Sequence, residues 1–543
     1  MLGLLSNPMN GMPIEATKAI VPLGIGLASA AFLAMKAVAT PKFPNDKRIP
    51  MASLRPGDSS HDNEYNEDPN AFIKRCEEEC GPFFNVFLHG FPYTVVSNPY
   101  ISEVYTSGDF SHLDTFEDLT SMMAYFNTIR KSNKHNGLQT PHDIVRNILN
   151  PNLPMFTPEI AKLVEENLEQ ELGRCPVEKG RILVKNPFHL IHELVAKAMA
   201  HVFVGPEVAK SRQIVETFMS AAADFGEVIG VHAPTSKWRT LALRLNYKSF
   251  HNPLQKHLQV LVDVSTPVVL ERRRLEALAN ETGVEWERPR DILQQLLDNA
   301  DKYGFVDLED VCAHILILIV ISVHTTADAA NSMLYYMAAF PHSMDKLFEE
   351  QQQILNDIQA EREHARQECL KKGEPINDHL DPAHDKDLPV AAVKKMVHLD
   401  SFIRESFRVR AEPLSMITNR RARRDSTFSN GYKISKGASF IINARSGHMG
   451  PEAGEDATEF RPWRFVGKAK TAIKVGPDYL PFGMGGHACP GRFMAIMELK
   501  VIGALIVTKF SKVEMQDPSK TKMALHSRLG EPIPSGLKFF IRE

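Results

Sequence analysis

Cysteine is scarce in this sequence, and its spacing excludes the common structural uses of cysteine. The chain has 543 residues but only six cysteines, at positions 76, 80, 175, 312, 369 and 489. Six are too few for a disulfide scaffold of this size, and no CxxC pair of the kind found in zinc sites occurs. We therefore expect reduced thiols.

The chain also lacks an excess of charge of one sign. Its 63 Lys and Arg residues are balanced by 66 Asp and Glu residues, which leaves a formal net charge of −3. This balance gives no electrostatic reason to expect nucleic acid as a partner. The composition is 43% hydrophobic and 24% charged, so a disordered or fibrous chain is excluded and a large apolar core is expected.

Long uncharged runs are rare. The first of them, residues 19–35, ends at Lys36 and, extended through Val38, predicts a transmembrane anchor at residues 19–38. Its length is about the 20 residues that cross a bilayer. A cleaved secretory signal is the alternative, because Ala37-Val38-Ala39 resembles a cleavage site. Basic residues follow the run at Lys36, Lys42, Lys47 and Arg48. They favour a lumenal segment 1–18 and a cytosolic remainder.

The rest of the chain predicts one large, mainly helical unit. Three prolines make residues 39–50 a stiff linker, and residues 51–543 are expected to form one domain. Apolar residues recur at helical spacing from about residue 70 to 420. Strand-like alternation is local, near residues 83–96 and 427–443, where Asn430-Gly431 marks a hairpin turn. The fold class is therefore mainly α with small β-sheets.

A glycine-rich loop carries the last cysteine and precedes an apolar helical run. Residues 482–492 read FGMGGHACPGR. A cysteine at a helix N-terminus meets the positive end of the helix dipole and unpaired N–H groups, which favour a thiolate bound to a metal. Glycines such as Gly483 allow the backbone to pass close to something bulky and planar. The loop would suit a cofactor held by one thiolate.

Three other interpretations of the loop remain open on these residues alone. The string G-M-G-G-H-A imitates a dinucleotide fingerprint, although only about 50 residues follow it. Cys489 could be an inert core cysteine, which is a frequent fate of an isolated thiol. Together, His487 and Cys489 would supply at most two zinc ligands.

The loop resembles the haem-binding segment FxxGx(H/R)xCxG of the cytochrome P450 monooxygenases. The matching residues are Phe482, Gly485, His487, Cys489 and Gly491. Upstream, Glu405-Ser-Phe-Arg408 resembles the ExxR motif of the family, and residues 460–465 (FRPWRF) resemble its FxPxRF segment. The resemblance implies that Glu405, Arg408 and Arg464 form a charge network supporting the loop. Alone, the ExxR match could be an ordinary helix ion pair.

An almost wholly apolar run, residues 311–323, precedes His324-Thr325-Thr326. At 13 residues the run is too short to span a bilayer and predicts a buried central helix, with Asp307 and Asp310 as candidate caps. It resembles the central-helix pattern (A/G)Gx(D/E)T(T/S) of the family. The resemblance implies that Thr325 hydrogen-bonds the dioxygen molecule that the haem iron binds. His324 replaces the usual acid, so it could relay protons or be a core histidine.

The resemblance further implies haem b as the cofactor, placed between the central helix and the cysteine loop of a cytochrome P450 fold. Cys489 would be the axial iron ligand, with Phe482 and Gly483 of the loop next to the haem. His487, Arg420 and Arg146 would bind the haem propionates, although His142 replaces the tryptophan of the WxxxR pattern that contains Arg146.

The resemblance implies a microsomal monooxygenase of the endoplasmic reticulum, with its catalytic domain in the cytosol. Electrons would come from NADPH through the FAD and FMN of NADPH-cytochrome P450 reductase, with cytochrome b5 as an optional second donor. The segment ITNRRARRD is similar to filamentous-fungal members that oxidise terpenoids or steroids, so a small apolar substrate of that kind is expected. A haem-thiolate isomerase or dehydratase, or a non-catalytic haem or sterol binder, is the alternative.

Overall fold

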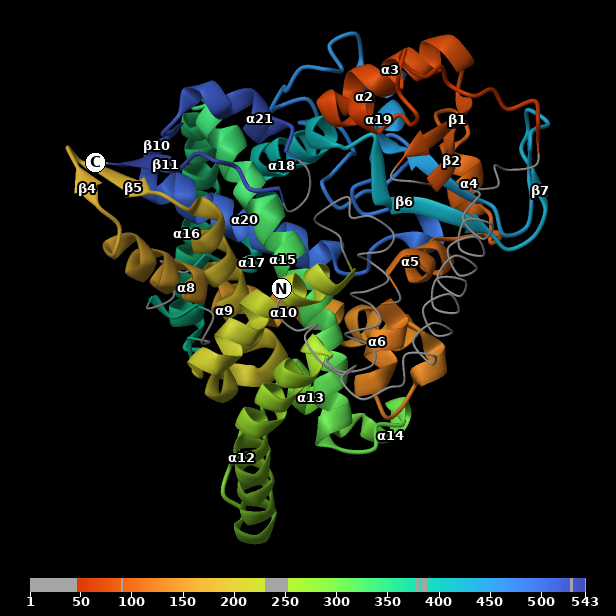
Figure 1. Cartoon of the computed structure of the whole chain (residues 1–543). Coiled ribbons are helices and arrows are strands. Elements are labelled where there is room, and N and C mark those ends of the chain that lie inside the picture. The colour runs from red at the N-terminus through yellow and green to blue at the C-terminus, as the bar shows by residue number, and fades with distance from the viewer. Residues whose placement is uncertain are drawn as a thin grey trace, which may run out of the picture.

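Figure 1 shows a mainly helical molecule with small sheets near its margins. The computed structural model describes residues 46–88, 91–120, 122–229, 252–376, 380–382, 388–527 and 531–542. The expected lumenal segment and anchor, residues 1–38, lie outside the described residues, as does the expected linker up to residue 45. Those segments stay predictions, whereas the mainly α architecture with small sheets is confirmed.

Short helices occupy the N-terminal part of the chain. They are α2 (Asp62–Glu67), α3 (Pro69–Cys80), α4 (Ile101–Thr106), α5 (His112–Thr120), α6 (Met122–Ile129), the 3-10 helix η1 (Lys134–Asn136), α7 (Gln139–Ile144) and the π-helix η2 (Val145–Leu149). Long helices follow: α8 (Asn150–Gly173), α9 (Pro187–Ala209), α10 (Arg212–Ile229), α12 (Pro253–Thr282), α13 (Ile292–Asp298), α14 (Ala300–Tyr303), α15 (Leu308–Ala339) and α16 (Ser343–Lys372).

The C-terminal third carries the helices that surround the cysteine loop. They are α17 (Val390–Lys395), α18 (Val397–Arg410), α19 (Ala444–His448), α20 (Arg492–Lys509) and α21 (Thr521–Leu525), with 3-10 turns η5 (Pro451–Ala453), η6 (Gly485–His487) and η7 (Pro518–Lys520). The charged segment from residue 349 onward continues α16 to Lys372, as its composition predicts.

Three sheets complete the fold. The largest has the strand order β1 (Phe83–Leu88), β2 (Phe91–Val96), β9 (Ser439–Asn443), β6 (Leu414–Ala422), β3 (Phe110–Ser111). A second sheet joins β10 (Phe510–Met515), β11 (Leu537–Ile541), β5 (Arg181–Val184) and β4 (Val177–Glu178). The third pairs β7 (Ser426–Thr427) with β8 (Lys433–Ile434). Both predicted strand regions are confirmed: β1 and β2 form an antiparallel hairpin, and Gly431 turns the β7–β8 hairpin with φ +81°.

Helix α15 is the central element of the core, and in Figure 1 it runs as a green rod through the middle of the molecule. Asp307 caps its start by accepting a hydrogen bond from the backbone N–H of Asp310 at 2.9 Å, as expected. Asp310 is itself fully buried and receives the backbone N–H groups of Lys131 and Ser132. Both acids therefore fix the start of the helix.

The length argument that excluded a membrane span for this helix was wrong. Helix α15 has 32 residues, and among the described residues it is the one helix that is long and apolar enough to cross a bilayer. Within the protein, however, 72% of its most apolar window is buried. It packs against α9, α10, α12 and α20, and each buried Ile or Leu contributes about 1.5–3 kcal/mol. Burial by neighbouring helices, rather than shortness, identifies it as a core helix.

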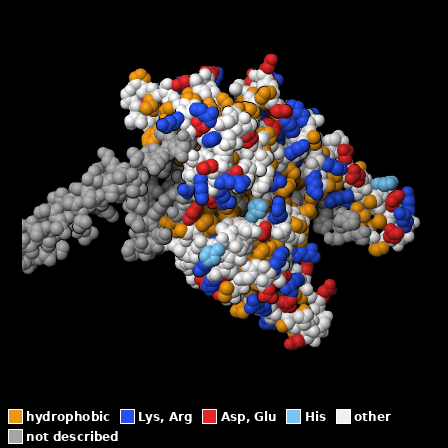
Figure 2. All heavy atoms as spheres, turned by 90° about the vertical axis from the view of Figure 1, so that its right-hand side faces the viewer, with side chains coloured by type: hydrophobic (Ala, Val, Ile, Leu, Met, Phe, Trp, Pro, Cys, Tyr) orange, Lys and Arg blue, Asp and Glu red, His pale blue; other side chains and the backbone are white. Residues whose placement is uncertain are grey.

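Basic and acidic side chains are interspersed on the face shown in Figure 2. Surface ion pairs among the described residues include Arg423 with Asp114 at 2.9 Å and Arg424 with Asp109. The arginine run at residues 420–424 is thus divided between a buried residue of β6, Arg420, and surface ion pairs.

Candidate functional site

The cysteine loop is closed by backbone hydrogen bonds. The Cys489 N–H donates to the Phe482 carbonyl at 2.7 Å, and the Gly483 N–H donates to Leu480 at 2.9 Å. Gly483 and Gly485 have φ values of +68° and +60°, which L side chains adopt only with strain. The glycines of the motif therefore allow the chain to reverse its direction between Phe482 and Cys489.

Arg492, the first residue of α20, fastens the other side of the loop. Its Nη1 donates to the Cys489 carbonyl at 2.7 Å, and its Nε donates to the Ile473 carbonyl at 3.1 Å. Asn150, at the start of α8, donates to the Pro490 carbonyl at 3.0 Å. Together these contacts fix the backbone on both sides of the sulfur.

Cys489 itself is solvent-exposed, yet enough protein surrounds its sulfur to affect its ionisation. Desolvation raises the pKa of the thiol, while the backbone N–H groups of Gly491 and Arg492 and the Arg492 charge act in the opposite direction. The expected N–H donors are thus present, but desolvation outweighs them. A bound cation would supply the stabilisation that a thiolate here still needs.

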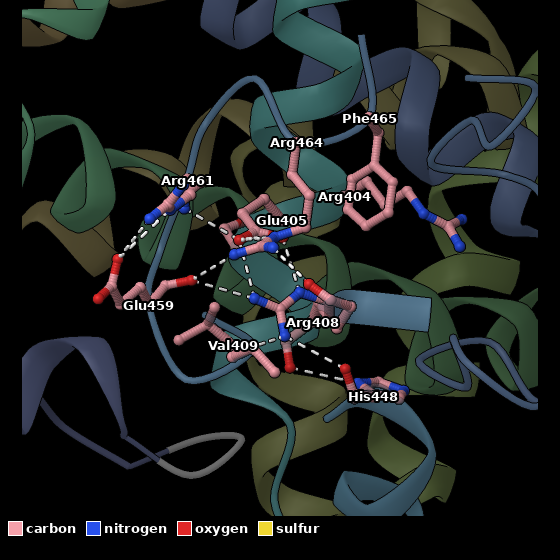
Figure 3. A network of polar contacts seen from close by, with 12 residues as sticks. Arg404, Glu405, Arg408, Val409, His448, Glu459, Arg461, Arg464 and Phe465 are labelled. Carbon is pink, nitrogen blue, oxygen red and sulfur yellow. Dashed lines mark hydrogen bonds and ion pairs between the residues drawn. The ribbon is translucent and has the colours of Figure 1, made fainter. Parts of the chain in front are cut away.

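Behind the loop lies the predicted charge network, drawn in Figure 3. Glu405 is fully buried on α18 and receives a bidentate pair from Arg408, at 2.7 and 2.8 Å. The Nε of Arg464 donates to the same carboxylate at 2.9 Å, as does the Arg461 N–H. Fork-shaped arginine pairs of this kind are among the strongest hydrogen-bonded contacts in proteins. The structure therefore brings Glu405, Arg408 and Arg464 together.

The two arginines use their remaining donors on backbone carbonyls. Arg408 donates to Ala457 at 2.5 Å, to Glu459 at 3.1 Å and to His448 at 3.2 Å. The Nη1 of Arg464 donates to the Ala453 carbonyl at 2.5 Å and to the Asp456 carboxylate at 2.6 Å. The network thus ties helix α18 to the segment 448–464, in which the only elements after α19 are short turns such as η5.

Thr325 lies at a gap in the burial of α15. Ile321, one turn earlier, is 40% exposed and Thr325 is exposed as well, while the residues before and after this turn are buried. The Thr325 hydroxyl donates to the backbone carbonyls of Ile321 and Ser322 at 3.1 and 3.0 Å. The predicted threonine is therefore accessible, with its oxygen lone pairs still able to accept a hydrogen bond.

The His324 side chain packs against helix α9, whereas the Thr325 side chain is exposed. Its ring packs edge-on against Phe188 and His192 of α9, with ring centroids 5.3 and 5.5 Å away. His192 was not predicted from the sequence; burial lowers its pKa to about 4, so this ring is neutral at pH 7. The role of His324 in proton delivery stays a prediction.

Arg420 has the features of an anion-binding residue. It is 3% exposed, and its Nε is buried with no hydrogen-bond partner among the described residues. Its guanidinium lies 4.7 Å from the ring centroid of Tyr105, and a Cβ added to Gly485 of the loop would lie 3.3 Å from the Tyr105 carbonyl. Tyr105 thus connects Arg420 to the cysteine loop.

The other two predicted propionate donors are less defined. Arg146 is exposed on η2. Desolvation lowers the pKa of Arg492, and the charge of Arg146 adds a smaller effect in the same direction, so Arg146 lies near the start of α20. The backbone of His487 belongs to η6, but its side chain lies outside the described part of the structure. Its propionate role stays a prediction.

These residues fit a haem. Among the described residues, no group of three or more His, Cys, Asp or Glu side chains could hold a bare metal ion. A porphyrin brings four nitrogen ligands of its own and requires one axial ligand from the protein, which a single cysteine supplies. Arg420 offers an unused buried donor, and Ile321, Ile417 and Phe493 offer exposed apolar surface.

Sequence reasoning missed three residues around the network. His448, Arg404 and Tyr479 are buried: Arg404 belongs to helix α18, His448 ends α19, and Tyr479 precedes the cysteine loop. None belongs to a short motif, and an isolated histidine, arginine or tyrosine carries no signal of its partners. Figure 3 shows His448 beside Arg408.

Comparison with known proteins gives consistent matches. The family model described as Cytochrome P450 matches residues 61–537. The chain is 26% identical to cytochrome P450 monooxygenase paxP of Penicillium paxilli, over 66% of this chain and 64% of that protein. It is 26% identical to cytochrome P450 monooxygenase 151 of Postia placenta, over 69% and 70%, and 28% identical to sdnB of Sordaria araneosa, over 59% and 56%. Two of these three relatives are thus matched over less than two thirds of their own length.

Proposed function

The chain belongs to the cytochrome P450 family, and we propose that it is an NADPH-dependent haem-thiolate monooxygenase that inserts one oxygen atom of O₂ into a C–H bond of an apolar substrate. The observation that carries the proposal is the cysteine loop. It is complete in sequence, it is closed by the Cys489–Phe482 backbone hydrogen bond, and the intact Glu405–Arg408–Arg464 network lies behind it.

The protein's contribution is to bind and orient the haem. Cys489 would hold the iron from one side, while Arg420, Arg146 and His487 would neutralise the propionates, which cannot be buried as free charges. When bound, a thiolate-ligated haem activates O₂ because the sulfur pushes electron density toward the oxygen and promotes O–O cleavage. The N–H groups of Gly491 and Arg492 disperse the charge of the sulfur.

Thr325, which would lie on the side of the haem away from Cys489, is the proposed catalytic residue. Its hydroxyl is exposed in the middle of an otherwise buried helix, and it already donates to the preceding turn. The hydroxyl oxygen can therefore accept a hydrogen bond from a bound group, while the hydroxyl hydrogen stays bonded to the preceding turn of the helix. His324 is proposed to hold a proton near this threonine, since imidazole titrates close to neutral pH.

The proposed substrate is a steroid or terpenoid. Apolar side chains are exposed on three elements that the family resemblance places at the substrate pocket: Leu113 on α5, Ile321 on α15 and Ile417 on β6. A hydroxylated product would then be more polar than the substrate. The reductase as electron donor, and an anchor at residues 19–38 in the endoplasmic reticulum membrane, complete the proposal.

A spectroscopic and kinetic experiment tests the function. The purified holoprotein is reduced under carbon monoxide, and its difference spectrum distinguishes thiolate from histidine-type ligation. Steroids and terpenes are then screened for spin-state shifts, and NADPH consumption with added reductase is measured for each compound that binds. A histidine-type spectrum contradicts the thiolate assignment. Substrate conversion without NADPH consumption would instead support an isomerase or dehydratase.

A further inference from the structure

His448, the last residue of α19, uses both of its ring nitrogens. Nδ1 lies 3.3 Å from the backbone carbonyl of Arg408, and Nε2 accepts the backbone N–H of Leu480 at 2.7 Å. The residue is 1% exposed. One imidazole therefore connects the end of helix α18, which carries the charge network, to the segment that enters the cysteine loop.

The partners fix the chemical form of this imidazole. A carbonyl can only accept, so Nδ1 carries the hydrogen, and an N–H can only donate, so Nε2 is bare. The ring is then neutral. Burial lowers the pKa of His448 to about 3, and the charges of Arg408, Arg404 and Arg445 add to this effect. The same tautomer thus persists throughout the physiological pH range.

Close packing surrounds the histidine and prevents it from turning. Its ring stacks on Tyr479, with centroids 5.8 Å apart and planes at 23°. The other partner of Tyr479 is Arg404, whose guanidinium lies 3.8 Å from the tyrosine centroid. At Gly447, an added Cβ would lie only 2.0 Å from the Pro477 carbonyl, so helix α19 approaches the 477–480 segment backbone to backbone.

A continuous series of hydrogen bonds leads from His448 to the cysteine. Leu480 donates to His448, and the Leu480 carbonyl accepts the N–H of Gly483 at 2.9 Å. Within the same turn, the carbonyl of Phe482 accepts the N–H of Cys489 at 2.7 Å. A displacement of Leu480 would therefore move both ends of the loop that presents the sulfur.

We propose that His448 is a positioning residue that transmits the rigidity of the Glu405–Arg408 network to the Cys489 loop, through its bonds to Arg408 and Leu480. This inference rests on the proposed haem-thiolate function. The residue acts on the sulfur only through the loop backbone and does not touch it. Its loss loosens the loop while leaving the charge network itself intact.

Three substitutions separate the two bonds of His448 in the holoenzyme. His448→Gln can place an amide oxygen near the Nε2 position and keep the bond from Leu480. His448→Asn places its amide near Nδ1, so it keeps the bond to Arg408 and loses the bond from Leu480. His448→Phe keeps the ring and loses both bonds. His314→Phe is the matched control, because His314 is also fully buried with Nδ1 on a carbonyl, 2.8 Å from Asp310. That control site lies eleven residues before Thr325, about 16 Å along α15.

Two readouts are measured for every variant. The first is the rate at which the thiolate-type carbon monoxide spectrum converts to a neutral-thiol or histidine type at fixed temperature. The second is hydrogen exchange of the Leu480 amide, which depends on the bond to His448 whatever the haem ligand. A buried hydrogen bond lost without replacement corresponds to a change of about tenfold.

We expect all three His448 variants to convert about tenfold faster than the wild type, because His448→Gln lacks the bond to Arg408, His448→Asn lacks the bond from Leu480 and His448→Phe lacks both. Protection at Leu480 is expected to be lost in His448→Asn and His448→Phe and kept in His448→Gln. His314→Phe is expected to stay close to the wild type in both readouts. A wild-type conversion rate in His448→Asn or His448→Gln, equal Leu480 protection in these two variants, or equal behaviour of the two Phe variants would overturn the inference. If the wild type has no thiolate spectrum, the proposed function fails, and unchanged exchange at Leu480 in His448→Asn would then overturn the link as well.

Discussion

Replacing Glu405 by glutamine removes one charge from the centre of the buried network and changes almost nothing in shape. Glu405 is fully buried and accepts four hydrogen bonds, two from Arg408, one from Arg464 and one from the Arg461 backbone. A glutamine amide would point donor hydrogens at a guanidinium. Arg408 would then lose its carboxylate partner, while Arg464 would keep only its pair with Asp456.

The expected loss follows from the burial of the partners. Arg408 and Arg464 have side-chain exposures of 2% and 6%, so water cannot replace the lost carboxylate. Breaking a buried pair by removing one partner costs about 3–5 kcal/mol. We expect Glu405→Gln to lower the free energy of unfolding by that amount. Because the network holds the segment behind the loop, we also expect haem to dissociate faster.

Denaturant titration of the holoprotein, followed by circular dichroism and haem absorbance, measures both effects. Asp291→Asn is the matched control, since Asp291 is 5% exposed and pairs with the buried Arg272 at 2.8 Å, at the start of α13. It is expected to lose stability with haem and protein signals unfolding together. A Glu405→Gln protein within about 0.5 kcal/mol of the wild type, with unchanged haem release, would refute the reasoning.

Three further predictions concern single positions. Cys489→Ala is expected to abolish the thiolate spectrum and turnover with unchanged circular dichroism, and retention of both would contradict the axial-ligand assignment. Gly447→Ala is expected to destabilise the protein and loosen the loop, because the new Cβ would lie 2.0 Å from the Pro477 carbonyl; Gly173→Ala, with nothing within 4 Å, is the control, and equal denaturation midpoints would count against the close approach. Glu498 is buried on α20, neither of its carboxyl oxygens has a hydrogen-bond partner among the described residues, and burial raises its pKa to about 8. Its acid is thus protonated in the folded state, so stability falls by up to about 1.4 kcal/mol per pH unit as pH rises from about 4.5 to 8, and Glu498→Gln should flatten this slope in pH-dependent unfolding.

The sequence predicts the elements whose signal is local. The β1–β2 hairpin, the Asn430-Gly431 turn and the Asp307 cap depend on residues within a few positions of one another, and all three are confirmed. The ExxR pair is of the same kind, since a spacing of three places both side chains on one helix face. The length of α15 was underestimated because the apolar run was equated with the helix, which continues through polar residues to Ala339.

Tertiary structure decided which distant groups meet. No pattern in the chain relates His448 to Leu480, 32 positions away, or Arg420 to Tyr105, 315 positions away, because each contact depends on how separate elements pack. The same holds for His324, whose direction toward His192 follows from the packing of α15 on α9.

By itself, the sequence indicated the proposed haem-thiolate chemistry, because one cysteine in a glycine-rich turn and one ExxR pair are short-range patterns that can be read without knowing the fold. Only the folded structure decided what holds that chemistry in place. The supports of the loop are hydrogen bonds from buried side chains to backbone groups, and a backbone carbonyl or N–H is the same in every residue. Such contacts cannot be recognised in the amino-acid sequence, because they form only when the folded chain brings the two groups together.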